Sequence, residues 1–296
     1  MDNFMNSIIV GAHVSSSGGI YNAIDNAKAI NAEAIQIFPS APQMWRMTQH
    51  KPDAIEKFKE LYAASNLKEI WIHNIYLANL AADTNEHLNK SIESVLHALD
   101  LANQINANGV VLHTGSHKGK GFENVVDQVV SALEEILDRS PSSTILALED
   151  MAGQGGTIGT TFEELETLLK RVNSSRLKVC LDTCHAFAAG YDIRDEKSVS
   201  SVIQQFDDTI GLENLAVIHA NDSKVDLGEQ KDRHENIGQG YIGTVGFEAM
   251  LHHPGFAQKS FILEVPGYPE PQTGKSNGPD QINIDELKRI RSLQNS

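Results

Sequence analysis

Short apolar runs alternate with longer amphipathic stretches along the whole chain, and no low-complexity segment interrupts the alternation. The runs are rich in aliphatic and β-branched residues and predict buried strands. They are IIVGAHVS, AIQIFPS, EIWIHN, GVVLHTG, TILALED, LKVCLDTCH, LAVIHAND and SFILEVPG. Between them, apolar residues recur at helical spacing, most clearly over residues 85–104. The pattern therefore predicts eight strand-then-helix units.

Polar residues mark where two of the helices are expected to begin. Thr161 followed by Glu164 forms a capping box, a pair whose side chains bond to free N–H groups at a helix start. Asn283 with Glu286 predicts a similar start for the last helix.

Eight such units predict a fold of the α/β class, a (β/α)₈ TIM barrel, because an open doubly wound sheet rarely holds so many regular units. A chain of 296 residues, 41% of them hydrophobic, can bury a core of that size. We expect residues 1–296 to form a single domain.

Composition and the N-terminal sequence indicate the cellular compartment of the protein. No apolar run approaches the roughly 18 to 20 residues that a membrane span needs, and the N-terminus MDNFMNS lacks the pattern of a signal peptide. Cys180 and Cys184 lie too close on one expected strand and turn to favour a disulfide. We therefore expect a cytoplasmic protein without a membrane partner.

The net charge of −15 is unusual for a protein that binds nucleic acid, because phosphate-binding surfaces are usually basic. Bound divalent cations would offset part of this charge and concentrate positive potential in one cleft.

Metal-binding side chains lie in and just after six of the expected strands. In a parallel sheet the ends of all strands meet at one face, so these side chains are expected to converge there. The set is His73, His113, Glu149, Asp182, His185, His219, Asp232, His234 and Glu264.

Imidazole and carboxylate ligands without thiolate suit zinc, manganese or iron(II). Nine ligands are enough for two ions, and for three if one carboxylate is shared. Asp232 and His234, one residue apart in KDRHENIGQG, can chelate one ion together with His185. A water shared between two such ions is deprotonated near neutral pH and can attack phosphorus.

Simpler interpretations exist for single residues. A lone histidine at a strand end is more often a hydrogen-bonded structural residue, and only the recurrence over six strands favours metal. His13 closes the first strand without a carboxylate partner in sequence, so it is either a ligand or a residue that supports one. Cys184 is expected to be a packed thiol and GQGGTIG a tight turn. The remaining histidines, His50, His87, His97, His117, His252 and His253, are expected at the surface.

Several long motifs resemble those of the endonuclease IV family of apurinic/apyrimidinic endonucleases. They are ALEDMAGQGGTIG, LDTCHAFAAGYD, HANDSK followed by DRHENIGQGYIG, and LEVPG, and the resemblance runs from GAHVS to NGPDQIN. It implies a barrel with three Zn²⁺ ions, with Mn²⁺ as a substitute. It also implies a monomeric base excision repair enzyme, located with the nucleoid in a bacterium, that acts on double-stranded DNA with abasic sites or blocked 3′ ends. Such enzymes cut on the 5′ side of the abasic site and leave a 3′-hydroxyl and a 5′-deoxyribose phosphate.

The resemblance also implies roles for the nine residues. His73 and His113 would hold one ion, which Glu149 would bridge to a second ion held by Asp182, His219 and Glu264. His185, Asp232 and His234 would hold the third. Glu149 or Glu264 would be catalytic by orienting the attacking hydroxide.

In the family, side chains enter the DNA stack beside the lesion. The loop HNIYLANL matches that place, with Tyr76 and Leu77 as the wedge. Packing under a loop is the simpler role for both. Gln43 stands where well-known members carry an arginine that enters the base stack, and Arg46 lies nearby.

Two other functions compete. The same barrel superfamily includes metal-dependent sugar isomerases and epimerases, whose small polar substrates would suit an acidic protein. A barrel that only binds damaged DNA or stores zinc is the second. The paired Asp232 and His234 argue against the first, and the complete ligand set argues against the second.

Overall fold

The computed structural model describes residues 8–141, 143–271 and 273–293, and within them the expected strands form a closed barrel. Going round it, the order is β1-β10-β7-β6-β5-β4-β3-β2, and all neighbours run parallel. The strands are β1 (Ile9–His13), β2 (Ala34–Ile37), β3 (Glu69–His73), β4 (Gly109–Leu112), β5 (Ile145–Glu149), β6 (Leu177–Asp182), β7 (Leu215–His219) and β10 (Ser260–Leu263). The predicted TIM barrel is confirmed.

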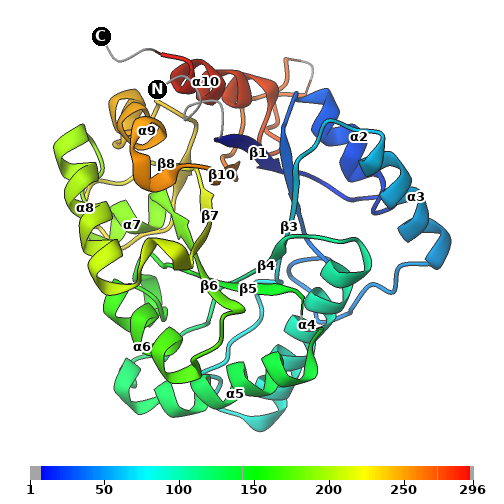
Figure 1. Cartoon of the computed structure of the whole chain (residues 1–296), viewed down its shortest axis with the longest axis vertical. Coiled ribbons are helices and arrows are strands. Elements are labelled where there is room, and N and C mark those ends of the chain that lie inside the picture. Colours follow the sequence, from blue (N-terminus) through cyan, green and yellow to red (C-terminus); the bar gives the residue numbers. More distant parts are fainter. Residues whose placement is uncertain (1–7, 142, 272, 294–296) are drawn as a thin grey trace.

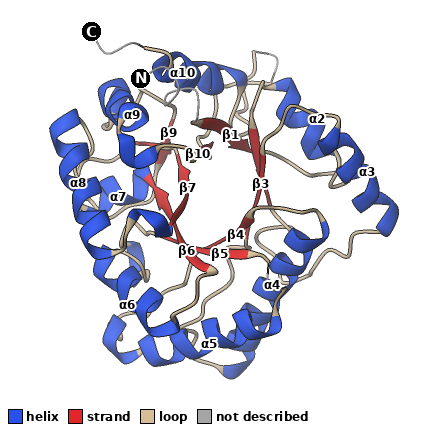
Figure 2. Cartoon of the chain, in the orientation of Figure 1, coloured by secondary structure: helices blue, strands red, loops and turns tan. Residues whose placement is uncertain are grey.

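Helices form a ring outside the strands, as Figures 1 and 2 show in a view along the barrel. They are α2 (Asn22–Ala29), α3 (Pro52–Ala63), α4 (Asn85–Gln104), α5 (Val126–Arg139), α6 (Phe162–Val172), α7 (Thr183–Ala189), α8 (Glu196–Thr209), α9 (Gly243–His252) and α10 (Gln281–Arg291). Short 3₁₀ turns lie at Phe122–Asn124, Gln154–Gly156, Leu212–Asn214 and Pro254–Phe256.

One of the two predicted helix starts is confirmed. Thr161 caps α6 by accepting a hydrogen bond from Glu164 N, and the Glu164 carboxylate accepts from Gly159 N and Thr160 N. The predicted start of the last helix is wrong by a few residues. Asp280 caps α10 by accepting from Asn283 N, because a carboxylate at this position satisfies a free N–H in the first turn.

Two local predictions need correction. The sixth strand was expected to include Thr183 and His185, but β6 ends at Asp182 and helix α7 begins at the next residue. The predicted strand LAVIHAND was expected to run to Asp222, but β7 ends at His219. Asp222 instead begins a short antiparallel pair, β8 (Asp222–Ser223) with β9 (His234–Glu235). Both differences lie at the C-terminal end of the barrel.

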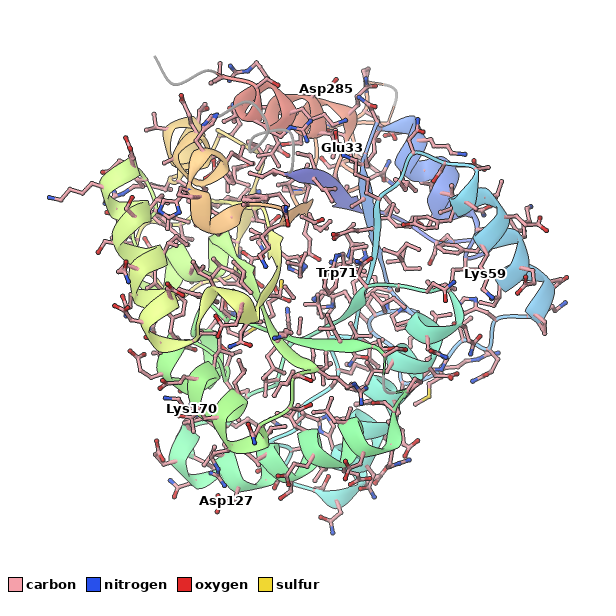
Figure 3. The ribbon with its side chains drawn as sticks, viewed as in Figure 1. Glu33, Lys59, Trp71, Asp127, Lys170 and Asp285 are labelled. Carbon is pink, nitrogen blue, oxygen red and sulfur yellow. The ribbon has the colours of Figure 1, made fainter. Side chains whose placement is uncertain are left out.

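One layer of the barrel interior is made of mostly apolar side chains, and Figure 3 shows Trp71 at the centre of the ring. Successive residues of a strand face opposite sides, so the residue two places further on points inward as well. In seven strands that next inward residue is polar. The inner layer consists of Ala34, Trp71, Val111, Ala147, Cys180, Val217 and Ile262. The residues two places on are Gln36, His73, His113, Glu149, Asp182, His219 and Glu264.

Among the described residues, no helix is both long and apolar enough to span a bilayer.

Candidate metal centre

The nine predicted ligands converge at the C-terminal end of the barrel and form three groups that contain only histidine and carboxylate side chains. Within each group, one nitrogen or oxygen atom per residue lies within 4.8 Å of the others. The groups are His73, His113 and Glu149; Glu149, Asp182, His219 and Glu264; and His185, Asp232 and His234. Glu149 is common to the first two groups, as a bridging carboxylate would be. Two further groups include a thiol, that of Cys180 with Glu149 and His219 and that of Cys184 with Asp182 and His234.

Glu149 lies at the middle of the centre and is fully buried. Its Oε2 atom lies 3.1 Å from Nε2 of His73 and 3.1 Å from Nε2 of His113. Its Oε1 atom lies 3.0 Å from Nδ1 of His219. The two oxygens therefore face different sets of imidazoles, so one carboxylate can serve two neighbouring ions.

The junction of β6 and α7 places two ligands within one turn. Asp182 ends the strand, and its Oδ1 caps α7 by accepting a hydrogen bond from His185 N. Its Oδ2 accepts from Asn221 Nδ2 and lies 3.6 Å from Nε2 of His234. A helix cap thus fixes Asp182 and brings His185 to the same side of the barrel.

The third group depends on the loop between β8 and β9. Asp232 lies on this loop, and its N–H donates to Gln154 Oε1 at 3.3 Å. Its two carboxylate oxygens lie 3.3 Å from Nε2 of His185 and 3.2 Å from Nε2 of His234. Gly153 adopts a left-handed conformation in the loop that carries Gln154, so the prediction of a tight turn in GQGGTIG is confirmed.

Four of the imidazoles use one nitrogen for a contact that fixes the ring. Nδ1 of His73 donates to Asn74 O at 2.7 Å, and Nδ1 of His185 donates to Asp150 O at 2.9 Å. Such contacts set the tautomer and leave the other nitrogen free for a metal. The rings of His219 and His234 are held in the same way, by Gln36 Oε1 and Glu264 O.

Charge within the centre follows from burial and proximity. Burial alone would raise the pKa of Glu149, but the facing His219 and His113 hold this pKa well below its usual value. Asp150 has no such partner of equal strength, and burial raises its pKa well above the usual value. The pKa of His234 is raised to about 9, because Asp182 and Asp232 outweigh the effect of burial.

These residues fit divalent cations. The Nε2 atoms of His185 and His234 are buried and make no hydrogen bond, although Asp232 oxygens lie close by. A buried nitrogen without a hydrogen bond is costly, and a bound cation would satisfy it. Histidine and carboxylate together are typical zinc ligands.

Three buried residues that support the ligands were missed by sequence reasoning. Gln36 bonds to both His219 and Glu264. Asp150 accepts from Asp182 N, and Asn221 Oδ1 accepts from Glu264 N. The two-residue period could have found Gln36, because it follows the inward-facing Ala34.

The remaining sequence candidates are placed as follows. His13 Nδ1 lies 3.3 Å from Glu264 Oε1 and belongs to none of the three groups, which suits a supporting residue. Cys184 is buried, and its thiol donates to Arg233 O at 3.5 Å, although Sγ also lies near Asp182 and His234. The six histidines expected at the surface are only partly exposed. They are His50, His87, His97, His117, His252 and His253.

The rim beside the centre carries the residues predicted to contact DNA. Tyr76 exposes 49% of its surface, and its ring centroid lies 5.6 Å from that of His113. Leu77 is partly buried and Gln43 is exposed. Tyr76 N donates to Pro42 O at 3.1 Å, so the loops after β2 and β3 are joined directly at this rim.

Two cavities open at Tyr76. One, of about 280 Å³, is lined by ligands of the third group. The other, of about 630 Å³, runs along the loops after β1 and β2. Tyr76 and Glu264 line both, so the exposed ring stands where the two cavities meet.

A parallel barrel that gathers imidazoles and carboxylates at its C-terminal face defines a metal-dependent TIM-barrel enzyme. Residues 24–293 match the family described as xylose isomerase-like TIM barrel. The chain is 38% identical over 276 residues to a probable endonuclease 4 of Halothermothrix orenii, and the match covers 93% of this chain and 98% of that relative. It therefore belongs to the endonuclease IV family of metal-dependent endonucleases.

Solved structures agree with this assignment. Endonuclease IV from Thermus thermophilus superposes with a TM-score of 0.81 at 33% identity, over 96% of this chain and 98% of that one. A D-tagatose 3-epimerase-like protein gives 0.70 at 20% identity, over 95% of both chains, and this shows the common fold alone.

Proposed function

We propose that the protein is a DNA repair endonuclease that hydrolyses the phosphodiester on the 5′ side of abasic sites in duplex DNA. The products are a 3′-hydroxyl and a 5′-deoxyribose phosphate. The observation that carries the proposal is the division of nine ligands into three groups, two of which share Glu149. Membership of the endonuclease IV family supports the choice of DNA as substrate.

Three zinc ions fit the three groups. His73, His113 and Glu149 would hold the first; Glu149, Asp182, His219 and Glu264 the second; and His185, Asp232 and His234 the third. Zinc in such sites lowers the pKa of bound water and stabilises negative charge on phosphoryl oxygens. Four of the 39 acidic side chains are proposed ligands in this cleft, and bound cations would neutralise their charge there.

The contribution of the protein's own side chains is to orient the attacking water. Glu149 is fully buried, whereas Glu264 exposes 11% of its side chain and lines both cavities. Of the two candidate catalytic carboxylates, Glu264 is therefore better placed to orient an attacking water toward a phosphate in the cavity. Its Oε2 lies 3.3 Å from Nδ1 of His219, while its Oε1 is held by Gln36.

Recognition of the lesion is assigned to the rim. An abasic nucleotide lacks a base, so a side chain can fill the gap in the stack and keep the sugar turned outward. Tyr76 is half exposed at the junction of the two cavities, with Leu77 next to it. The exposed Gln43 directly follows Pro42, whose carbonyl accepts the hydrogen bond from Tyr76 N, so Gln43 lies on the same rim. Exposure of Tyr76 favours a contact role over simple packing.

A sugar epimerase of the same fold is the competing function, and the structural similarity to an epimerase-like protein shows fold alone. The third group argues for the endonuclease, since it provides ligands beyond the one or two ions that a small-molecule isomerase uses. To test this, one zinc-loaded preparation is assayed separately with ketohexoses and with a DNA duplex that carries one abasic analogue. Strand cutting without epimerisation supports the proposal, and epimerisation without cutting overturns it.

A further inference from the structure

Gln36 links two ligand residues that lie on different strands. It is fully buried on β2, a strand that supplies no member of the three ligand groups. Its Oε1 accepts from His219 Nε2 at 2.9 Å, and its Nε2 donates to Glu264 Oε1 at 2.7 Å. Its Nε2 also lies 3.1 Å from Nδ1 of His13. Each of these partners belongs to the metal centre or contacts it.

The orientation of the amide follows from charge. Reversing it would place Gln36 Oε1 against the carboxylate of Glu264, where two acceptors would repel each other. The amide therefore donates to Glu264 and accepts from His219.

This orientation has a consequence for His219. In the neutral ring, an Nε2 atom that donates to Gln36 carries the only proton, so Nδ1 keeps a lone pair that can bind a cation. Nδ1 lies 3.0 Å from Glu149 Oε1 and 3.3 Å from Glu264 Oε2, so a cation bound in the second ligand group would replace a proton between these atoms. A different tautomer would turn an N–H toward the place of the ion.

We propose that Gln36 is a positioning residue for the second metal ion. It fixes the tautomer of His219 and the rotamer of Glu264 with one side chain. Partners of this kind typically affect metal affinity or activity by about 10- to 100-fold when they are removed.

The test compares Gln36→Met, which keeps the size of the side chain but loses both bonds, with the parent and with Gln128→Met. Gln128 is a suitable control because it donates two bonds to Leu80 O and Ala82 O and contacts no ligand. Zinc-loaded proteins are challenged with graded chelator, and retained zinc is measured by elemental analysis. Activity on a duplex with one abasic analogue is then measured with and without added zinc.

In Gln36→Met, about one zinc ion per chain should be lost at a chelator concentration 10- to 100-fold lower than the parent requires, and the other ions should be retained. The kcat should fall, added zinc should restore part of it, and KM for DNA should stay near the parent value. Gln128→Met should retain zinc as the parent does. Zinc retention in Gln36→Met within twofold of the parent overturns the inference.

Gln36→Asn serves if the methionine variant does not fold, because it keeps the amide but is too short to reach both partners. The same selective loss of zinc is expected, and parental retention counts against the inference. Since the inference rests on the proposed zinc centre, the parent is measured first. A parent that binds no zinc overturns the proposed function, whereas a loaded parent matched by both Gln36 variants overturns only the role of Gln36.

Discussion

Oδ2 of Asp232 lies 3.3 Å from Nε2 of His185, and this contact joins a loop residue to a buried helix residue. The side chain of His185 is 1% exposed, whereas that of Asp232 is 42% exposed. The third ligand group is therefore open to solvent on one side, while Glu149 and His219 in the other groups are fully buried. The third ion is expected to exchange more readily than the other two.

The first prediction concerns the number of ions. The parent should carry close to three zinc ions per chain, and Asp232→Asn should keep close to two, because the amide loses the charge that holds the exposed ion. Elemental analysis after dialysis against dilute chelator measures both. Asp226→Asn, an exposed acid of the same loop, is the control. A fully active parent with one ion per chain contradicts the three-ion centre.

The second prediction concerns Glu264. Glu264→Gln keeps the shape of the side chain but loses the charge that contributes to the second ligand group, so cleavage should fall by at least about 100-fold. Each tenfold loss corresponds to about 1.4 kcal/mol of activation free energy. Binding of lesion DNA should change much less, since phosphate contacts remain. Single-turnover cleavage and fluorescence anisotropy separate the two effects, and cleavage within tenfold of the parent would rule out the role.

The third prediction concerns the rim. Replacing Tyr76 and Leu77 by alanine should weaken binding to lesion DNA by a few kcal/mol, the scale of unstacking one base step. Binding to intact duplex depends mainly on phosphate contacts and should fall much less. The measured quantity is the ratio of the two affinities at fixed salt, with zinc content as the control. An unchanged ratio means that Tyr76 does not contact the lesion.

The fourth prediction concerns stability at the opposite end of the barrel. The Glu33 carboxylate accepts from Arg291 Nη1 at 2.7 Å and from Val10 N at 2.9 Å, which ties α10 to the starts of β1 and β2; Figure 3 shows Glu33 beneath α10. Burial would raise the pKa of Glu33, but its bonds to Arg291 and Val10 outweigh burial and hold this pKa below its usual value. Glu33→Gln should therefore cost about 1–3 kcal/mol of unfolding free energy at neutral pH.

The sign of the pH dependence follows from that lowered pKa. The contribution of Glu33 is complete above its unfolded pKa and is lost as the pH falls through the folded value. Urea unfolding of the parent and Glu33→Gln should therefore differ most near pH 7 and converge toward pH 3. Glu60→Gln, on the exposed side of α3, should show no such difference. A gap that is constant over this range would show that Glu33 is not held ionised by Arg291.

The barrel could be predicted because its strands are buried on both faces and are separated by amphipathic helices. The ligands His73 and Glu149 could be predicted because they end such strands, two places after inward-facing apolar residues. Gln36 also lies two places after an inward-facing apolar residue, Ala34. It was missed because an amide is an ordinary strand residue until its two partners are known.

Other features depend on contacts between distant segments. The pairing of β8 with β9 and the bond from Asp232 N to Gln154 place the third group, and neither has a local pattern in the sequence. The end of β6 at Asp182 was missed because the β-branched Thr183 fits a strand as well as it fits the first turn of a helix. The cap made by Asp182 is what turns the chain into α7.

The central claim is that this centre cuts DNA at abasic sites, and mapping the ends of a cut duplex tests it most directly. The zinc-loaded protein is incubated with a duplex that carries one abasic analogue in a labelled strand. A single cut on the 5′ side of the analogue, leaving a 3′-hydroxyl and abolished by chelation, is the predicted result. An uncut duplex under zinc-replete conditions, or a cut on the 3′ side, would contradict the account.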